Sequence, residues 1–106
     1  MPKSVLPSGL IAGVLSLLPC PVLAEGFPLV GGQGFDWLNP GTAACQTITQ
    51  ADAAGFSRCD FDPRANAFAL PYPLYRCQAP CRREVLIYAS KAQCSQALQT
   101  MQANGP

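Results

Sequence analysis

The chain has 106 residues, with six cysteines, no histidine and a formal net charge of +1. Without histidine it lacks the usual general base, the usual catalytic zinc ligand and the Ser-His and Cys-His nucleophile pairs. Its near-neutral charge provides no electrostatic footprint for nucleic acid or an anionic membrane. We therefore expect a protein that is not an enzyme, has no cofactor and no metal site, and does not bind nucleic acid.

Residues 1–24 have the pattern of a secretory signal peptide. Lys3 supplies a positive start, and residues 10–18 form an apolar run that is too short to span a membrane. The sequence Val-Leu-Ala at 22–24 fits the small-residue pattern that signal peptidase cleaves. Cleavage after Ala24 leaves 82 residues with zero net charge, enough for one domain that needs disulfides for stability. We expect a bacterial protein of the periplasm or the extracellular space, with no stable membrane span after cleavage.

Residues 25–40 are predicted to be a flexible N-terminal arm followed by a short turn. The arm is rich in glycine, which is typical of loosely held chain. Asp36 can cap the turn, and Phe35 and Trp37 are expected to anchor it in the core rather than to form a binding platform. The small disulfide-containing domain is predicted to span residues 41–106.

Two helices are predicted in this domain. The first, at residues 49–56, begins with Thr-x-x-Asp, and the second, at residues 90–103, begins with Ser-x-x-Gln. Both sequences resemble capping boxes. Four apolar residues of the second helix recur at positions i, i+3, i+4 and i+7, and so share one face: Cys94, Ala97, Leu98 and Met101.

Three strands are predicted between the helices. Residues 57–62 alternate between polar or charged and apolar side chains, which is typical of a half-buried strand. Residues 72–77 form a second strand, which Pro73 restricts to a sheet edge or a strand start. Residues 83–89 are β-branched and aromatic and indicate a third. The expected fold class is therefore α+β: a small disulfide-stapled domain with a short three-stranded antiparallel sheet and two helices on one face.

The five cysteines of the cleaved chain allow two disulfides and one free thiol, since an export compartment is oxidising. In the predicted meander, Cys59 and Cys77 lie at one end of the sheet. Cys45 and Cys94 lie near the two helix starts at the other end. Because a bridge needs Cα atoms within about 7 Å, this arrangement favours the pairs Cys45–Cys94 and Cys59–Cys77. Cys81 is then the free thiol.

The surroundings of Cys81 leave several roles open. It lies beside Arg82 and Arg83 in the turn between the second and third strands, and adjacent positive charge is typical of reactive thiols. The alternatives are an intermolecular bridge, or a Cys77–Cys81 pair that leaves another cysteine free. A four-cysteine zinc site is disfavoured, because oxidation competes with metal binding in an exported protein.

Two groups of charged residues also have more than one interpretation. Asp60 and Asp62 lie about 7 Å apart on one strand face and loosely resemble a glycosidase carboxylate pair. Solvated carboxylates partnered by nearby arginines are the simpler interpretation. Arg76, Arg82 and Arg83 can form an anion-binding patch, although a solvated hairpin end accounts for them without any ligand.

The favoured function is a structural or binding module whose partner is an unknown protein or envelope component. The strand edge at residues 72–76 is the expected contact. One alternative is a thiol redox or covalent-linkage protein that uses Cys81. Another is a secreted inhibitor or effector, for which residues 63–71 form the only loop of suitable length. No catalytic and no metal-ligating residues are predicted.

Overall fold

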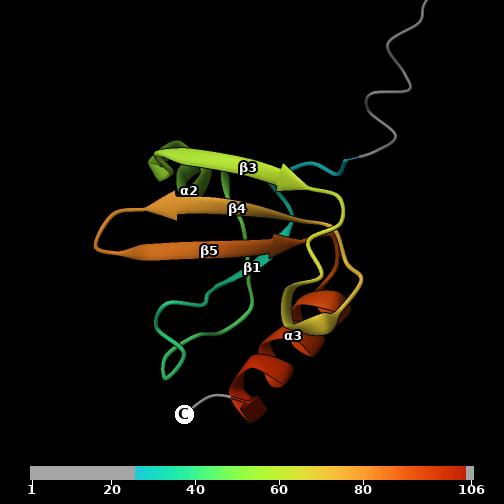
Figure 1. The fold of residues 1–106 in the computed structure, drawn as a ribbon. Coiled ribbons are helices and arrows are strands. Elements are labelled where there is room, and N and C mark those ends of the chain that lie inside the picture. Colours follow the sequence, from blue (N-terminus) through green and yellow to red (C-terminus); the bar gives the residue numbers. More distant parts are fainter. Residues whose placement is uncertain (1–25, 105–106) are drawn as a thin grey trace, which may run out of the picture.

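The computed structural model describes residues 26–104 and consists of a five-stranded antiparallel sheet with helices packed on it (Figure 1). The predicted signal peptide lies outside the described residues. In space the strands follow the order β2-β1-β5-β4-β3. The elements in chain order are β1 (Gln33–Asp36), β2 (Gln46–Thr47), α2 (Gln50–Gly55), β3 (Arg58–Asp62), the 3₁₀ helix η2 (Ala67–Ala69), β4 (Leu74–Ala79), β5 (Arg83–Tyr88) and α3 (Lys91–Asn104).

The α+β class and the antiparallel sheet are confirmed, but the sheet has five strands instead of three. The predicted strands are present as β3, β4 and β5, joined as a meander. The additional strand β1 pairs with β5, from Gln33 opposite Tyr88 to Asp36 opposite Val85, and β2 pairs with β1. The sheet therefore includes residues that were predicted to belong to the arm and turn.

The two helices cover opposite faces of the sheet, which corrects the expectation that both lie on one face (Figure 1). Consecutive residues of β5 point to alternate faces, yet Val85, Leu86, Ile87 and Tyr88 are all buried. A strand with this burial needs a cover on each side. We call the face of the sheet that packs on α3 the α3 face. Its buried cluster consists of Phe35, Leu74, Leu86, Tyr88, Cys94, Ala97 and Met101.

The other face, the α2 face, has a smaller core. Its buried residues are Ile48, Cys77, Val85 and Ile87. Four half-buried side chains pack against this cluster, and they come from the N-terminal segment, from β4 and from the end of α2: Phe27, Leu29, Phe56 and Tyr75.

The described part of the predicted arm packs on the α2 face. The Phe27 ring lies edge-on to the rings of Tyr75 and Phe61, at 5.0 and 5.9 Å between ring centroids. The Tyr75 hydroxyl donates a hydrogen bond to the Phe27 carbonyl over 2.6 Å. Further along, the Gly31 N–H donates to the Ile48 carbonyl over 2.8 Å. These contacts hold the segment that leads into β1.

Both helices begin with the predicted caps. Thr49 and Asp52 form the complete box: the Thr49 hydroxyl accepts from the Asp52 N–H over 3.1 Å, and the Asp52 carboxylate accepts from the Thr49 N–H over 2.9 Å. In α3 the Ser90 hydroxyl accepts from the Gln93 N–H over 3.2 Å, whereas the Gln93 side-chain oxygen is buried and has no partner among the described residues. The apolar face of α3 is confirmed, since Cys94, Ala97 and Met101 are buried.

Two disulfides connect the elements, and they join the cysteine pairs that were predicted from the sequence. Cys45, which precedes β2, is bonded to Cys94 of α3, with 6.1 Å between the Cα atoms. Cys59 of β3 is bonded to Cys77, its register partner on β4, with 4.1 Å between the Cα atoms. Cys81 is the free cysteine of the described chain and is exposed.

Candidate functional site

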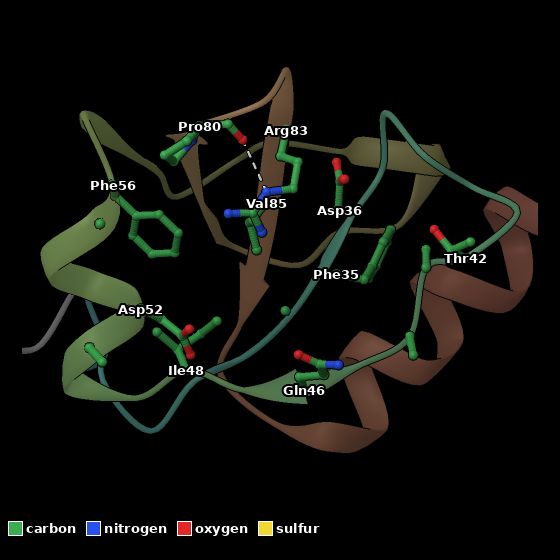
Figure 2. A pocket seen from close by; sticks show the side chains of 15 residues that line it. Phe35, Asp36, Thr42, Gln46, Ile48, Asp52, Phe56, Pro80, Arg83 and Val85 are labelled. Atoms are coloured by element: carbon green, nitrogen blue, oxygen red, sulfur yellow. Dashed lines mark hydrogen bonds between the residues drawn. The ribbon is translucent and has the colours of Figure 1, made fainter.

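A groove lies on the α2 face of the sheet, between α2 and residues 42–46 (Figure 2). Its floor includes Gly34, Ile48 and Val85, and its volume is about 330 Å³. Ile48 is 5% exposed and Val85 is 7% exposed, so the floor is apolar and well packed. Pockets for small molecules range from about 300 to 1,000 Å³, and this groove is at the small end of that range.

The local sequence explains why the groove stays open. Gly34 has no side chain to project from the middle of β1. The strand β2 has only two residues, so the segment before it is not held along β1. Cys45 fixes that segment to α3, because its disulfide connects to Cys94. The groove therefore remains open above its floor, with residues 42–46 on one side and α2 on the other.

Two carboxylates on the rim are occupied by structural hydrogen bonds. Asp36 closes the turn after β1, because its Oδ1 atom accepts from the N–H groups of Leu38 and Glu84 over 3.1 and 3.2 Å. This turn cap was predicted from the sequence. Asp52 lines the groove from α2 and accepts from the Thr49 N–H as part of the capping box. Both carboxylates thus stabilise the walls of the groove.

Two other polar side chains of the rim have unused hydrogen-bonding groups. Arg83 donates from Nε to the Pro80 carbonyl over 3.1 Å, and no described residue accepts from its Nη atoms. The side-chain amide of Gln46 likewise has no hydrogen-bond partner within residues 26–104. Figure 2 shows Arg83 and Gln46 on opposite sides of the groove. An apolar floor with separated polar groups above it is the usual composition of a ligand site.

The arginines that were considered as an anion patch do not form one cluster. Arg76 lies within β4 opposite Leu86, whose side chain belongs to the α3 face. Arg83 lies two residues before Val85 on β5 and lines the groove on the α2 face. Since side chains alternate along a strand, Arg76 and Arg83 project from opposite faces. Only Arg83 belongs to the groove.

Asp60 and Asp62 pair with arginines rather than with each other. The Asp60 carboxylate lies 3.0 Å from Nε of Arg58, and the Asp62 carboxylate lies 3.9 Å from Nη2 of Arg76. These residues lie on or beside the edge strand β3, and their side chains are more than a third exposed. Ion pairs in such positions contribute little to stability. This is the arrangement that the simpler interpretation predicts.

Cys81 lies at the tip of the hairpin between β4 and β5. Its φ angle is +65°, and that of Arg82 is +58°, so two successive residues other than glycine have the left-handed conformation. The thiol is exposed. In residues 26–104 no three cysteine or carboxylate side chains are placed to share a metal ion.

The prediction that residues 72–76 form an exposed strand edge for contact with a partner is wrong. β4 lies between β3 and β5, so its backbone groups are already paired on both sides. Pro73 directly precedes β4, which is the strand-start position that a proline can occupy. The exposed edge on this side is β3, and its charged residues discourage pairing with another strand.

The loop at residues 63–71 is partly packed on the sheet, and the Trp37 side chain lies outside the core, against expectation. The loop folds back on the α3 face, where the Phe68 ring stacks on Phe35 at 6.3 Å between centroids. Ala65, Ala67 and Leu70 also pack against this cluster, whereas Arg64, Asn66 and Ala69 are exposed. Trp37 is 36% exposed, and its Nε1 atom donates to Glu84 over 2.7 Å, so it stabilises the turn after β1 from outside the core.

Comparisons with family models, with curated proteins and with solved structures find no match to this chain. None of the helices in residues 26–104 has the length and apolar composition needed to cross a bilayer. The groove and the exposed thiol therefore have to be interpreted from their own chemistry.

Proposed function

We propose that this protein is an exported, disulfide-stabilised binding module, and that its binding site is the groove on the α2 face. The observation that carries the proposal is the groove itself. It combines a packed apolar floor at Ile48 and Val85 with unused hydrogen-bonding groups on Arg83 and Gln46. The two disulfides support the export part, since such bonds persist in oxidising compartments such as the periplasm and the extracellular space.

The rigid frame of the groove also supports a binding role. The Cys45–Cys94 bond fixes one wall, and the complete capping box at Thr49 and Asp52 fixes the start of the helix that forms the other. A site held in its binding conformation loses little entropy when a ligand enters. A domain of this size can therefore bind a small ligand or a single side chain of a partner.

A fragment screen by NMR tests this proposal. We expect small apolar fragments with one polar group to shift the backbone amides of Ile48, Phe56 and Val85 in the cleaved protein. Ala51 lines the groove from α2, and Ala51→Trp should fill it and abolish binding. Ala54 lies on the same helix outside the groove, so Ala54→Trp is the matched control that should still bind. Equal binding by both variants, or no binding by the unmodified protein, contradicts the proposal.

The exposure of Cys81 at the hairpin tip favours a second candidate, a disulfide link to a partner in the oxidising compartment. Intact mass measured without reductant and after alkylation tests it. The binding module alone should have the mass of residues 25–106 with four hydrogens missing and one alkylated thiol. A mass that is increased by the mass of a partner indicates the covalent link instead, provided that the increase is absent from Cys81→Ser.

A further inference from the structure

We propose that the groove on the α2 face binds a carboxylate with a small apolar body, and that Arg83 holds the carboxylate. This inference rests on the proposed function and specifies the class of ligand. Its first support is the position of Arg83, which lies on the rim above the apolar floor (Figure 2). Floor and guanidinium together match a ligand that is apolar at one end and anionic at the other.

The hydrogen bonds of Arg83 leave its two Nη atoms free to bind a ligand. The bond from Nε to the Pro80 carbonyl, at 3.1 Å, fixes the side chain against the hairpin. The two Nη atoms have no acceptor among residues 26–104. Paired N–H groups of a planar guanidinium match the two oxygens of a carboxylate, which is the geometry that makes arginine the preferred partner of this group.

The two carboxylates that line the groove, Asp36 and Asp52, are engaged in structural hydrogen bonds. Both oxygens of Asp36 already accept hydrogen bonds, Oδ1 from backbone N–H groups and Oδ2 from the Asn39 amide. The Asp52 carboxylate accepts from the Thr49 N–H. Arg83 is therefore the charged group of the groove whose donors remain available, and Gln46 can bind a further polar group of the ligand.

The floor determines the size of the apolar body. It is lined by Ile48, Val85 and the half-buried Phe56 ring, within a volume of about 330 Å³. An enclosed apolar cavity of about 150 Å³ is enough for benzene. The groove therefore suits one aromatic ring or one branched aliphatic group next to the carboxylate. This chemistry occurs in free arylalkanoic acids and in the C-terminal residue of a peptide.

An NMR titration of the cleaved protein with phenylacetate and phenylacetamide tests the charge preference. The two probes have the same ring and nearly the same shape, but only phenylacetate is anionic. We expect phenylacetate to shift the amides of Ile48, Phe56 and Val85, and to bind about tenfold more tightly than the amide, as a charged hydrogen bond predicts. Arg83→Gln should remove this difference, while Arg82→Gln at the exposed hairpin tip should keep it.

A third probe, N-acetyl-Gly-Gly-Phe with a free C-terminus, distinguishes the two sources of the carboxylate. Binding that is at least as tight as that of phenylacetate indicates a peptide terminus, and weaker binding indicates a small free acid. Equal affinity for phenylacetate and phenylacetamide in the groove overturns the carboxylate inference and leaves the binding module standing. No shift at the three amides with any probe, together with a failed fragment screen, overturns both.

Discussion

At Gly34 the sheet has no room for a side chain. A Cβ atom added there would lie 2.9 Å from a side-chain carbon of Ile87, from a side-chain carbon of Val85 and from the Leu86 carbonyl oxygen. Backbone and buried side chains close the space, so the structure cannot adjust cheaply. The same missing side chain leaves the floor of the groove open. One glycine thus permits the pairing of β1 with β5 and the concave surface above it.

We predict that Gly34→Ala lowers the free energy of unfolding by about 1 to 3 kcal/mol, the usual cost of overpacking. Gly41→Ala is the control, because a Cβ at Gly41 would meet no atom within 4 Å. Urea unfolding followed by circular dichroism measures both. Equal stability of the two variants would show that β1 moves away from β5 without cost.

Tyr88 is the second residue with a specific consequence. Its ring is buried next to Phe35, and its hydroxyl has no hydrogen-bond partner among the described residues. Burial raises the pKa of Tyr88 from 10.0 to about 12, although the charge of Arg76 opposes this shift. Between these two pH values the unfolded chain loses the proton and the folded chain keeps it. Stability therefore falls as the pH rises from 10 to 12.

We predict that Tyr88→Phe reduces this alkaline loss of stability. The phenylalanine ring fits the same space, and no hydrogen bond is lost, so stability at pH 7 should be unchanged or slightly higher. Thermal unfolding at pH 7, 10 and 11 compares the two proteins. If the alkaline decrease is the same in both, another group causes it.

At the scale of elements, the hairpin between β4 and β5 has an unfavourable turn sequence. Cys81 and Arg82 both have positive φ angles, at +65° and +58°. A residue with a Cβ in the left-handed region costs roughly 1 to 2 kcal/mol compared with the right-handed one, and glycine avoids that cost.

We predict that Arg82→Gly raises the free energy of unfolding by about 0.5 to 1 kcal/mol, because the gain at the turn is partly offset by the greater entropy of the unfolded chain. Lys91→Gly is a comparison in which glycine should destabilise, since Lys91 is the first residue of α3. The midpoint of urea unfolding measures both variants. A less stable Arg82→Gly protein would contradict the turn geometry.

Local sequence patterns predicted the elements that depend on neighbouring residues. The capping box at Thr49 defines the start of α2, the Ser90 cap defines the start of α3, and the period of the apolar residues defines the buried face of α3. The strands β3, β4 and β5 follow from alternation and β-branched composition. The register of β3 and β4 then places Cys59 opposite Cys77, so that disulfide depends only on the predicted hairpin.

The missed elements depend on residues far away in the chain. β1 has one large apolar side chain, Phe35, and is a strand because it pairs with β5. The two-residue β2 has no period of its own. The apolar run of residues 85–88 indicates that β5 is buried on both faces. A strand buried on both faces needs a cover on each side, so the helices lie on opposite faces of the sheet. The groove depends on all of these features and has no local sequence signature.

At the scale of the whole molecule, the disulfides supply much of the stability of a chain this short. The Cys45–Cys94 bond has a sequence separation of 49 and the Cys59–Cys77 bond one of 18. The loop-entropy relation gives contributions of about 4 and about 3 kcal/mol. Both are large compared with a typical total of about 5 to 15 kcal/mol.

We predict that replacing Cys45 and Cys94 by alanine destabilises the protein by about 1 kcal/mol more than replacing Cys59 and Cys77. Each pair includes one fully buried cysteine, so the losses of packing are similar. Denaturant unfolding of the two double variants gives the comparison. A larger loss for the Cys59 and Cys77 variant would mean that the edge strand, rather than the attachment of α3, limits stability.

The two disulfides are nested, because the Cys59–Cys77 bond lies within the segment that the Cys45–Cys94 bond encloses. A protease that hydrolyses one peptide bond between these outer cysteines opens the backbone but does not release a fragment. Within residues 63–71 the cut lies inside both covalent rings, and the two pieces stay joined twice. The nicked molecule then differs from the intact one by a single water until a reductant separates it. After a single cut of this kind, thiol chemistry rather than the peptide backbone decides whether the molecule stays in one piece.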